Sequence, residues 1–201
     1  MKTRVVDWAA ESRSLPGEFE CGDKCVVTEV IGGVLVAVID GLGHGGEAAR
    51  AAECAVVSIK ENANRSFTSL ILQCHAAQRQ TRGAVMSLAL LDDNRSMTWM
   101  GIGNVEGRVI RNSIKHAEKS ESLLLRTGMV GGEGNNLPAM YPTGVSLVRG
   151  DILVLTTDGI RNDFEAQINP ASKPKVIAEN IITHHRRLND DALVFVGRYI
   201  G

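Results

Sequence analysis

The order in which strand-like and helix-like segments follow one another is the feature that most constrains the fold of this chain. Two β-branched runs at 25–30 and 34–39 are separated by a Gly-Gly pair, which is typical of a hairpin. Two helical segments then follow in succession, one at 47–61 and one that Ser66 can cap, before strand-like runs return. The strand–helix alternation of a doubly wound fold is therefore absent. We predict an α+β fold, a layered αββα sandwich with two mainly antiparallel sheets flanked by helices.

The other elements are predicted in the same way. Strand-like runs are found at 4–11, 83–91, 97–102, 105–110, 152–157 and 192–200, and a third helix is predicted at 172–184. Residues 127–144 are rich in Gly, Asn and Pro and predict a long loop, which in a compact domain is more often functional than idle. The sequence contains no repeat, low-complexity tract or linker, so we expect a single domain over residues 1–201.

The composition argues against several classes of function. Of 201 residues, 44% are apolar and 22% are charged, as in soluble globular domains. The net charge of −1 gives no field that would attract nucleic acid or anionic lipid. No apolar run reaches the ~18 residues of a membrane span, and the first residues do not resemble a signal peptide. We therefore expect a cytoplasmic protein that binds neither nucleic acid nor a membrane.

Aspartates at the ends of the predicted strands are the candidates for chemistry. They are Asp23, Asp40, Asp158 and the pair Asp190-Asp191. An unpaired carboxylate near the core is costly, so these charges would need a shared cation if the strand ends converge. Oxygen ligands suit Mg²⁺ or Mn²⁺, and no cluster of Cys and His competes for the role. On spacing alone, aspartates that merely cap turns remain the alternative.

Two such ions would define a particular chemistry. A pair of hard cations ~3.5–4 Å apart activates a water and clamps a phosphoryl oxygen. That arrangement hydrolyses phosphomonoesters without a covalent intermediate, so it needs neither a serine nor a cysteine nucleophile.

Several motifs, taken together, resemble a known family. They are CGD at 21–23, DGLGHG at 40–45, GIGNVEGRV at 101–109, GMVGG at 128–132, TTDGI at 156–160 and NDDA at 189–192. In this order they resemble the metal-dependent protein phosphatases, the PPM family, and most closely its bacterial SpoIIE-like branch. The resemblance implies a metal-dependent protein serine/threonine phosphatase with two divalent cations, Mn²⁺ or Mg²⁺. The short chain resembles compact members that dephosphorylate phosphorylated STAS-domain proteins of the stressosome and so reset a bacterial stress response.

The resemblance also implies a role for each matching residue. Asp40 would bridge both metals and the activated water, and the backbone carbonyl of Gly41 would bind one of these metals. Asp23 would help to hold that same metal, directly or through water. Asp158 and Asp190 would hold the other.

The chain departs from the family pattern near these ligands. Asp191 is expected to support the ligands or to begin the last strand rather than to bind a metal itself. Many relatives have Thr where Leu193 stands, so a hydroxyl near the site is lost. The eukaryotic branch has His where Leu42 stands. His44, two residues further on, is either a possible general acid or a solvated residue at a helix start.

The position of a basic phosphate-binding residue is also left open. The one in the eukaryotic branch has no clear counterpart, so the substrate phosphate is expected to be held mainly by the metals. Arg79 and Arg82 flank the end of a predicted helix, where basic residues are expected from the helix dipole alone. Docking of a phosphoprotein is the alternative role for them.

Three alternative functions remain at this stage. One is a module of the same fold that binds phosphorylated STAS-domain proteins without catalysis, for which Leu193 is the one favourable feature. Another is a phosphomonoesterase for small metabolites. The third is a structural protein whose aspartates cap turns, and its stability would not depend on metal.

Overall fold

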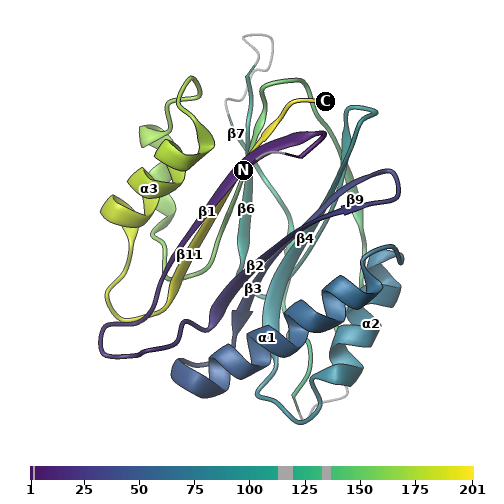
Figure 1. Cartoon of the computed structure of the whole chain (residues 1–201), viewed down its shortest axis with the longest axis vertical. Coiled ribbons are helices and arrows are strands. Elements are labelled where there is room, and N and C mark those ends of the chain that lie inside the picture. The colour runs from purple at the N-terminus through teal and green to yellow at the C-terminus, as the bar shows by residue number, and fades with distance from the viewer. Residues whose placement is uncertain (2, 113–119, 133–136) are drawn as a thin grey trace.

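Two β-sheets pack face to face and are covered on their outer sides by helices (Figure 1). The computed structural model describes residues 1, 3–112, 120–132 and 137–201. The first sheet is antiparallel throughout, in the order β1 (Val6–Arg13), β11 (Ala192–Tyr199), β10 (Ile152–Thr156), β6 (Glu106–Ile110) and β7 (Ser120–Ser122). The predicted αββα sandwich is confirmed.

The second sheet carries the hairpin predicted from the sequence. Its order is β2 (Asp23–Val30), β3 (Gly33–Gly41), β4 (Ala84–Asp92), β5 (Ser96–Ile102) and β8 (Leu125–Arg126), with β9 (Thr143–Ser146) also paired to β5. All its pairs are antiparallel except that of β5 with β8. Both sheets are therefore mainly antiparallel, as expected.

The helices divide between the two outer faces. The second sheet is covered by α1 (Gly45–Asn62) and α2 (Phe67–Ala77), and the first by α3 (Pro174–His185) and the short 3₁₀ helix η1 (Asn162–Gln167). Ser66 caps α2 as predicted, because its hydroxyl accepts a hydrogen bond from the backbone N–H of Ser69.

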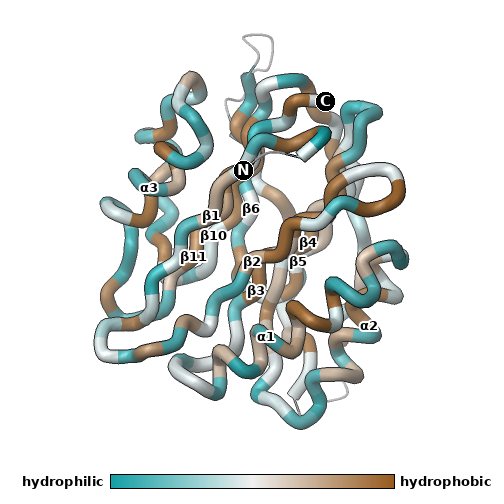
Figure 2. The backbone as a smooth tube through the Cα atoms, in the orientation of Figure 1, coloured by the Kyte–Doolittle hydropathy of each residue, from teal (hydrophilic) through white to brown (hydrophobic). Residues whose placement is uncertain are grey.

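Burial on both faces explains why the central strands are apolar without interruption. In β3, one set of side chains faces the other sheet and the alternate set faces the helices; the sets are Val34, Val36 and Val38, and Leu35, Ala37 and Ile39. Strand β10 is divided in the same way between the other sheet and α3. Figure 2 shows this pattern as hydrophobic strands between helices with polar outer surfaces. Such strands lose the polar alternation of a half-exposed sheet.

The turn at Gly103-Asn104 connects the two sheets rather than two neighbouring strands. It joins β5 of the second sheet to β6 of the first, so these two strands do not form a hairpin with each other. The consequence is that Asn104 lies at the end of the sandwich where strands of both sheets begin or end.

The predicted helices and long strands are all present, with ends that shift by a few residues. The structure adds β7, β8, β9 and η1, which the sequence did not predict. The predicted loop at 127–144 is only partly correct: Val130 forms a bridge with Ala84, and β9 begins at Thr143. Residues 133–136 of that loop lie outside the described residues.

Within the described ranges, no helix has the length and apolar character needed to cross a bilayer.

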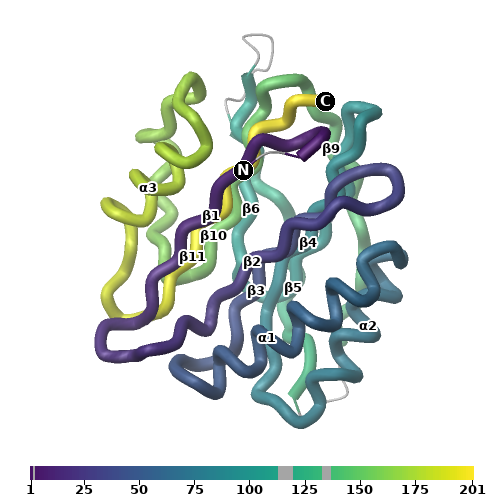
Figure 3. The backbone as a smooth tube through the Cα atoms, viewed as in Figure 1, coloured from purple at the N-terminus to yellow at the C-terminus, as the bar shows by residue number. Residues whose placement is uncertain are grey.

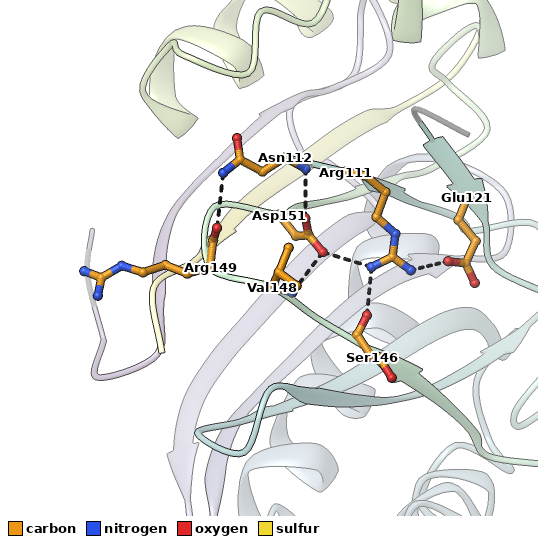
Figure 4. A network of polar contacts seen from close by, with 7 residues as sticks. All are labelled: Arg111, Asn112, Glu121, Ser146, Val148, Arg149 and Asp151. Atoms are coloured by element: carbon orange, nitrogen blue, oxygen red, sulfur yellow. Dashed lines mark hydrogen bonds and ion pairs between the residues drawn. The ribbon is translucent and has the colours of Figure 1, made fainter. Parts of the chain in front are cut away.

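A buried polar network lies at the end of the first sheet where β10 begins (Figure 4). The side chain of Asp151 is completely buried, and its oxygens accept hydrogen bonds from Arg111 Nη1 at 2.9 Å and from the backbone N–H groups of Asn112 and Val148 at 2.9 and 3.1 Å. Arg111 also pairs with Glu121, whose side chain is 46% exposed.

We expect Asp151→Ala to lower the free energy of unfolding by about 3–5 kcal/mol, because it takes one carboxylate from the mostly buried Arg111 side chain and leaves two backbone amides without their acceptor. Glu121→Ala removes a carboxylate from the same arginine at an exposed position and should cost about 1 kcal/mol or less. Urea unfolding of both variants measures this difference. If both variants lost the same free energy of unfolding, the buried position of Asp151 would not explain its contribution to stability.

Candidate metal centre

Strand pairing brings the first two candidate ligands together. In the β2–β3 hairpin, Asp23 is the direct cross-strand partner of Asp40. Both belong to the alternate positions that face the other sheet, since Cys25 and Val38 on the same faces pack into the core between the sheets. Asp23 is almost fully buried and Asp40 is half-buried. Two carboxylates therefore stand side by side at the end of the inter-sheet core.

A hydrogen bond joins this pair to the other sheet. The hydroxyl of Thr157, which follows β10, donates to Asp23 Oδ2 at 2.7 Å and accepts from the backbone N–H of Leu193 at 2.8 Å. Thr157 is buried, and so is the side chain of Leu193, which packs between the sheets. Thr157 thus supplies the hydroxyl next to Asp23, while the side chain of Leu193 packs in the core between the sheets.

Asp191 fixes the segment that leads into β2. Its two oxygens accept hydrogen bonds from the backbone N–H of Leu15 at 2.6 Å and of Gly22 at 2.8 Å. Figure 3 shows the connections before β2 and before β11 close together at the lower left of the molecule. The N–H of Gly41 in turn donates to the carbonyl of Gly22 at 3.1 Å. Asp191 therefore positions the backbone of Gly22, which precedes Asp23 in the sequence and is hydrogen-bonded to Gly41.

The remaining two candidates lie at the ends of the adjacent strands β10 and β11. Asp158 reaches solvent and accepts a hydrogen bond from Asn104 Nδ2 at 2.7 Å. Asp190 is half-buried, and its Oδ1 accepts from the backbone N–H of Asp191 at 2.9 Å. A Cβ at Gly159 would lie 1.8 Å from the carbonyl oxygen of Asp191, so only glycine allows these two strand ends to approach so closely.

Three of these aspartates, Asp23, Asp40 and Asp158, have a raised pKa because of burial and the charges of neighbouring aspartates. Burial and then the charges of the other four aspartates raise the pKa of Asp40. Burial also raises the pKa of Asp23, against the hydrogen bond from Thr157, and neighbouring aspartates add to the rise. At Asp158, partial burial and the charge of Asp190 raise the pKa, while Arg187 opposes the rise. The cluster carries more negative charge than its surroundings offset.

These residues fit hard divalent cations. The available donors are carboxylate and carbonyl oxygens, and an added positive charge would relieve the repulsion that raises the pKa of Asp40. Among the described residues, no three or more His, Cys, Asp or Glu side chains are already arranged as a cage for a metal ion. Mg²⁺ does not require one, because it keeps several waters and takes only one or two carboxylates.

His44 stands beside this cluster without entering it. It occupies the N-cap position of α1 with its side chain 61% exposed, and its Nδ1 lies 2.9 Å from Glu18 Oε1. This placement matches a solvated residue at a helix start and provides no contact with the aspartates. Leu42 packs partly against the core between the sheets.

Sequence reasoning missed two side chains that hydrogen-bond to the candidate ligands, Thr157 and Asn104. Thr157 could have been found by continuing the alternation of β10, since it shares a face with Leu153 and Leu155. Asn104 had no comparable signal, because its contact with Asp158 spans 54 positions and depends on how the two sheets meet.

Comparisons with known proteins agree with this geometry. No profile of a known protein family matches the chain. The phosphoserine phosphatase RsbX of Bacillus subtilis (strain 168) is 26% identical over 188 residues, which cover 90% of this chain and 89% of RsbX.

Solved structures extend the comparison. One comes from a study of the bacterial stressosome as a modular system adapted to control secondary messenger signalling. It is 30% identical, with a TM-score of 0.84, and covers 96% of this chain and 99% of its own. The structure of RsbX in complex with magnesium has a TM-score of 0.83 at 19% identity, covers 99% and 98% of the two chains, and supports the fold. The chain belongs to the PPM family of metal-dependent protein serine/threonine phosphatases, close to RsbX.

Proposed function

We propose that this phosphatase removes phosphate from phosphoserine or phosphothreonine of STAS-domain proteins in a bacterial stressosome, and so resets a stress response. The observation that carries the catalytic part is the gathering of five aspartates from both sheets at one end of the sandwich, with a raised pKa at Asp40, Asp23 and Asp158. The substrate class is supported by the relationship to RsbX and by the similar structure from the stressosome study.

The geometry supports one assignment of the metal ligands. Two divalent cations, Mn²⁺ or Mg²⁺, accompany this family's activity. Asp40 would bridge the two ions, because it stands beside Asp23 in the second sheet and lies near enough to Asp158 and Asp190 of the first sheet for their charges to raise its pKa. Asp23 and the carbonyl of Gly41 would hold one ion, since the hairpin places both beside Asp40. Asp158 and Asp190 would hold the other from the first sheet.

Bound at these residues, the cations would lower the pKa of a water, so that hydroxide would be available at neutral pH to attack phosphorus. The protein's own part is positioning. Thr157 orients the carboxylate of Asp23, and Asn104 orients that of Asp158. Asp191 holds the backbone of Gly22, which is hydrogen-bonded to Gly41. Such partners typically affect metal affinity or activity 10–100-fold. No serine or cysteine nucleophile is needed in this scheme.

The openness of the site favours a protein substrate. Asp158 is exposed and Asp40 is half-buried, so the cluster reaches the surface. Sites for small molecules usually enclose about 70–90% of their ligand. A phosphate carried on the surface of a folded protein can reach such a site without being enclosed.

We expect phosphate release from a phosphorylated STAS-domain protein in Mn²⁺ or Mg²⁺, and none after chelation. Asp40→Asn should reduce release by roughly a thousandfold or more, because the bridging charge is lost. The matched control is Asp93→Asn, which makes the same change at an exposed aspartate in the turn after β4. Tight binding without release would indicate the non-catalytic module, and faster turnover of free metabolites would indicate the small-molecule esterase.

A second expectation concerns Thr157. Thr157→Val keeps the shape of the side chain but removes the donor to Asp23, so Mn²⁺ affinity should fall about 10–100-fold. Thr157→Ser retains the hydroxyl and should stay within a few-fold of the wild type. Calorimetric Mn²⁺ titration of the two variants makes the comparison, and equal affinities would mean that the hydroxyl does not position Asp23.

A further inference from the structure

A groove lined by arginines lies on the side of the first sheet that α3 covers. It has a volume of about 430 Å³, and its lining includes Arg13, Arg161 and Arg186 together with the apolar residues Ile182 and Leu188. Arg13 ends β1, Arg161 lies in the connection after β10, and Arg186 follows α3. Three separate elements therefore each bring one arginine to the same groove.

The groove adjoins the end of the sheet where the aspartates gather. Arg161 stands three residues after Asp158, and Leu188 stands two residues before Asp190. Arg13 lies opposite the first residue of β11. A standard protein–protein interface covers about 800 Å² of each partner. A protein with its phosphorylated residue at the metal centre would therefore extend over the groove.

The groove carries positive charge. None of the described residues that line it is acidic. Two carboxylates approach its arginines from outside the lining: Glu11 Oε2 lies 3.3 Å from Arg13 Nη1, and Asp163 Oδ1 lies 3.5 Å from Arg161 Nε. The two arginine side chains are 51% and 47% exposed. Because ion pairs at such positions are weak, a carboxylate of a partner can compete for these guanidinium groups.

Backbone contacts hold the three arginines in place. Arg13 Nη1 donates to the carbonyl of Ser12 at 2.7 Å, and Arg161 Nη2 donates to the carbonyl of His184 at 2.7 Å. The carbonyl of Ser14 accepts from Nη2 of the third arginine, at position 186. Each guanidinium has five N–H donors, and these contacts use only part of them. The groove thus presents arginines that are oriented before a ligand arrives.

An apolar side chain stands among these charges. Leu188 is 73% exposed, whereas Ile182, in the same lining, is buried. A single exposed leucine is common on protein surfaces. Its place in a groove with three arginines is more specific, because protein–protein interfaces are enriched in arginine around an apolar core. The matching ligand is a peptide segment that carries both carboxylates and an apolar side chain.

We infer that this groove binds an acidic segment of the protein substrate while the phosphorylated residue of that substrate lies at the metal centre. The inference rests on the proposed function, since it takes a phosphoprotein as the substrate. The arginines pair with carboxylates of the segment, and Leu188 contacts an apolar side chain within it. The groove thereby selects which phosphoprotein is presented to the metals.

Steady-state kinetics on two substrates tests the groove. One is the phosphorylated STAS-domain protein, and the other is p-nitrophenyl phosphate, which has no segment to dock. Arg13→Glu combined with Leu188→Ala should raise KM for the phosphoprotein about tenfold or more and leave its kcat unchanged. Both constants for p-nitrophenyl phosphate should stay at wild-type values, which also shows that the variant is folded.

The matched control is Arg65→Glu combined with Leu72→Ala. It makes the same two changes at exposed positions beside the other sheet, in the turn before α2 and on α2 itself, and should leave both substrates unaffected. Arg161 and Arg186 are kept in both variants, because their guanidinium groups bind backbone carbonyls.

Salt provides a second readout. The KM of the wild type for the phosphoprotein should rise with NaCl concentration, and it should rise less in the variant with Arg13→Glu, because exposed charge pairs are screened. An unchanged phosphoprotein KM in the groove variant would overturn the docking role and leave the phosphatase intact. An equal rise for both substrates would also overturn it, since the effect would then lie at the metal centre. A wild type that hydrolyses p-nitrophenyl phosphate but no STAS-domain phosphoprotein would overturn the proposed substrate, and the docking role with it.

Discussion

Repulsion among five carboxylates at one end of the sandwich is the constraint on which the candidate site depends. Two of them, Asp23 and Asp40, are forced together by the register of a hairpin, and Asp191 is held in place by two backbone amides. Burial makes their charges costly, as the raised pKa values at Asp40 and Asp23 indicate. A fold that gathers uncompensated charge at the end of its core gives up stability there, which bound cations would restore.

The layered fold could be predicted because both faces of the central strands are buried. The run at 34–39 is apolar throughout, and the two successive helical stripes exclude a doubly wound sheet. The short strands β7, β8 and β9 could not be predicted, since segments of two to four residues with exposed positions carry no periodic signal. The turn at Gly103-Asn104 gave no indication that it crosses between sheets, because a turn signature does not specify which strands pair afterwards.

The candidate ligands could be predicted, and of the two side chains that hydrogen-bond to them, Thr157 carried a signal in the alternation of β10 whereas Asn104 carried none. An aspartate that interrupts an apolar strand is visible in the sequence, as at Asp40 and Asp158. The contacts of Thr157 and Asn104 depend on how separate elements approach one another. Assignment of the ligands to individual metals remains a prediction.

Calorimetric titration of the metal-free protein with Mn²⁺ near neutral pH, in buffers of different ionisation enthalpy, tests the central claim most directly. We expect two ions per chain and release of protons to the buffer, because carboxylates with a raised pKa must lose their protons to bind metal. Asp40→Asn should no longer bind both ions. Absence of Mn²⁺ binding to the wild type, or equal stoichiometry and affinity in Asp40→Asn, would show that the aspartate cluster is not a two-metal site.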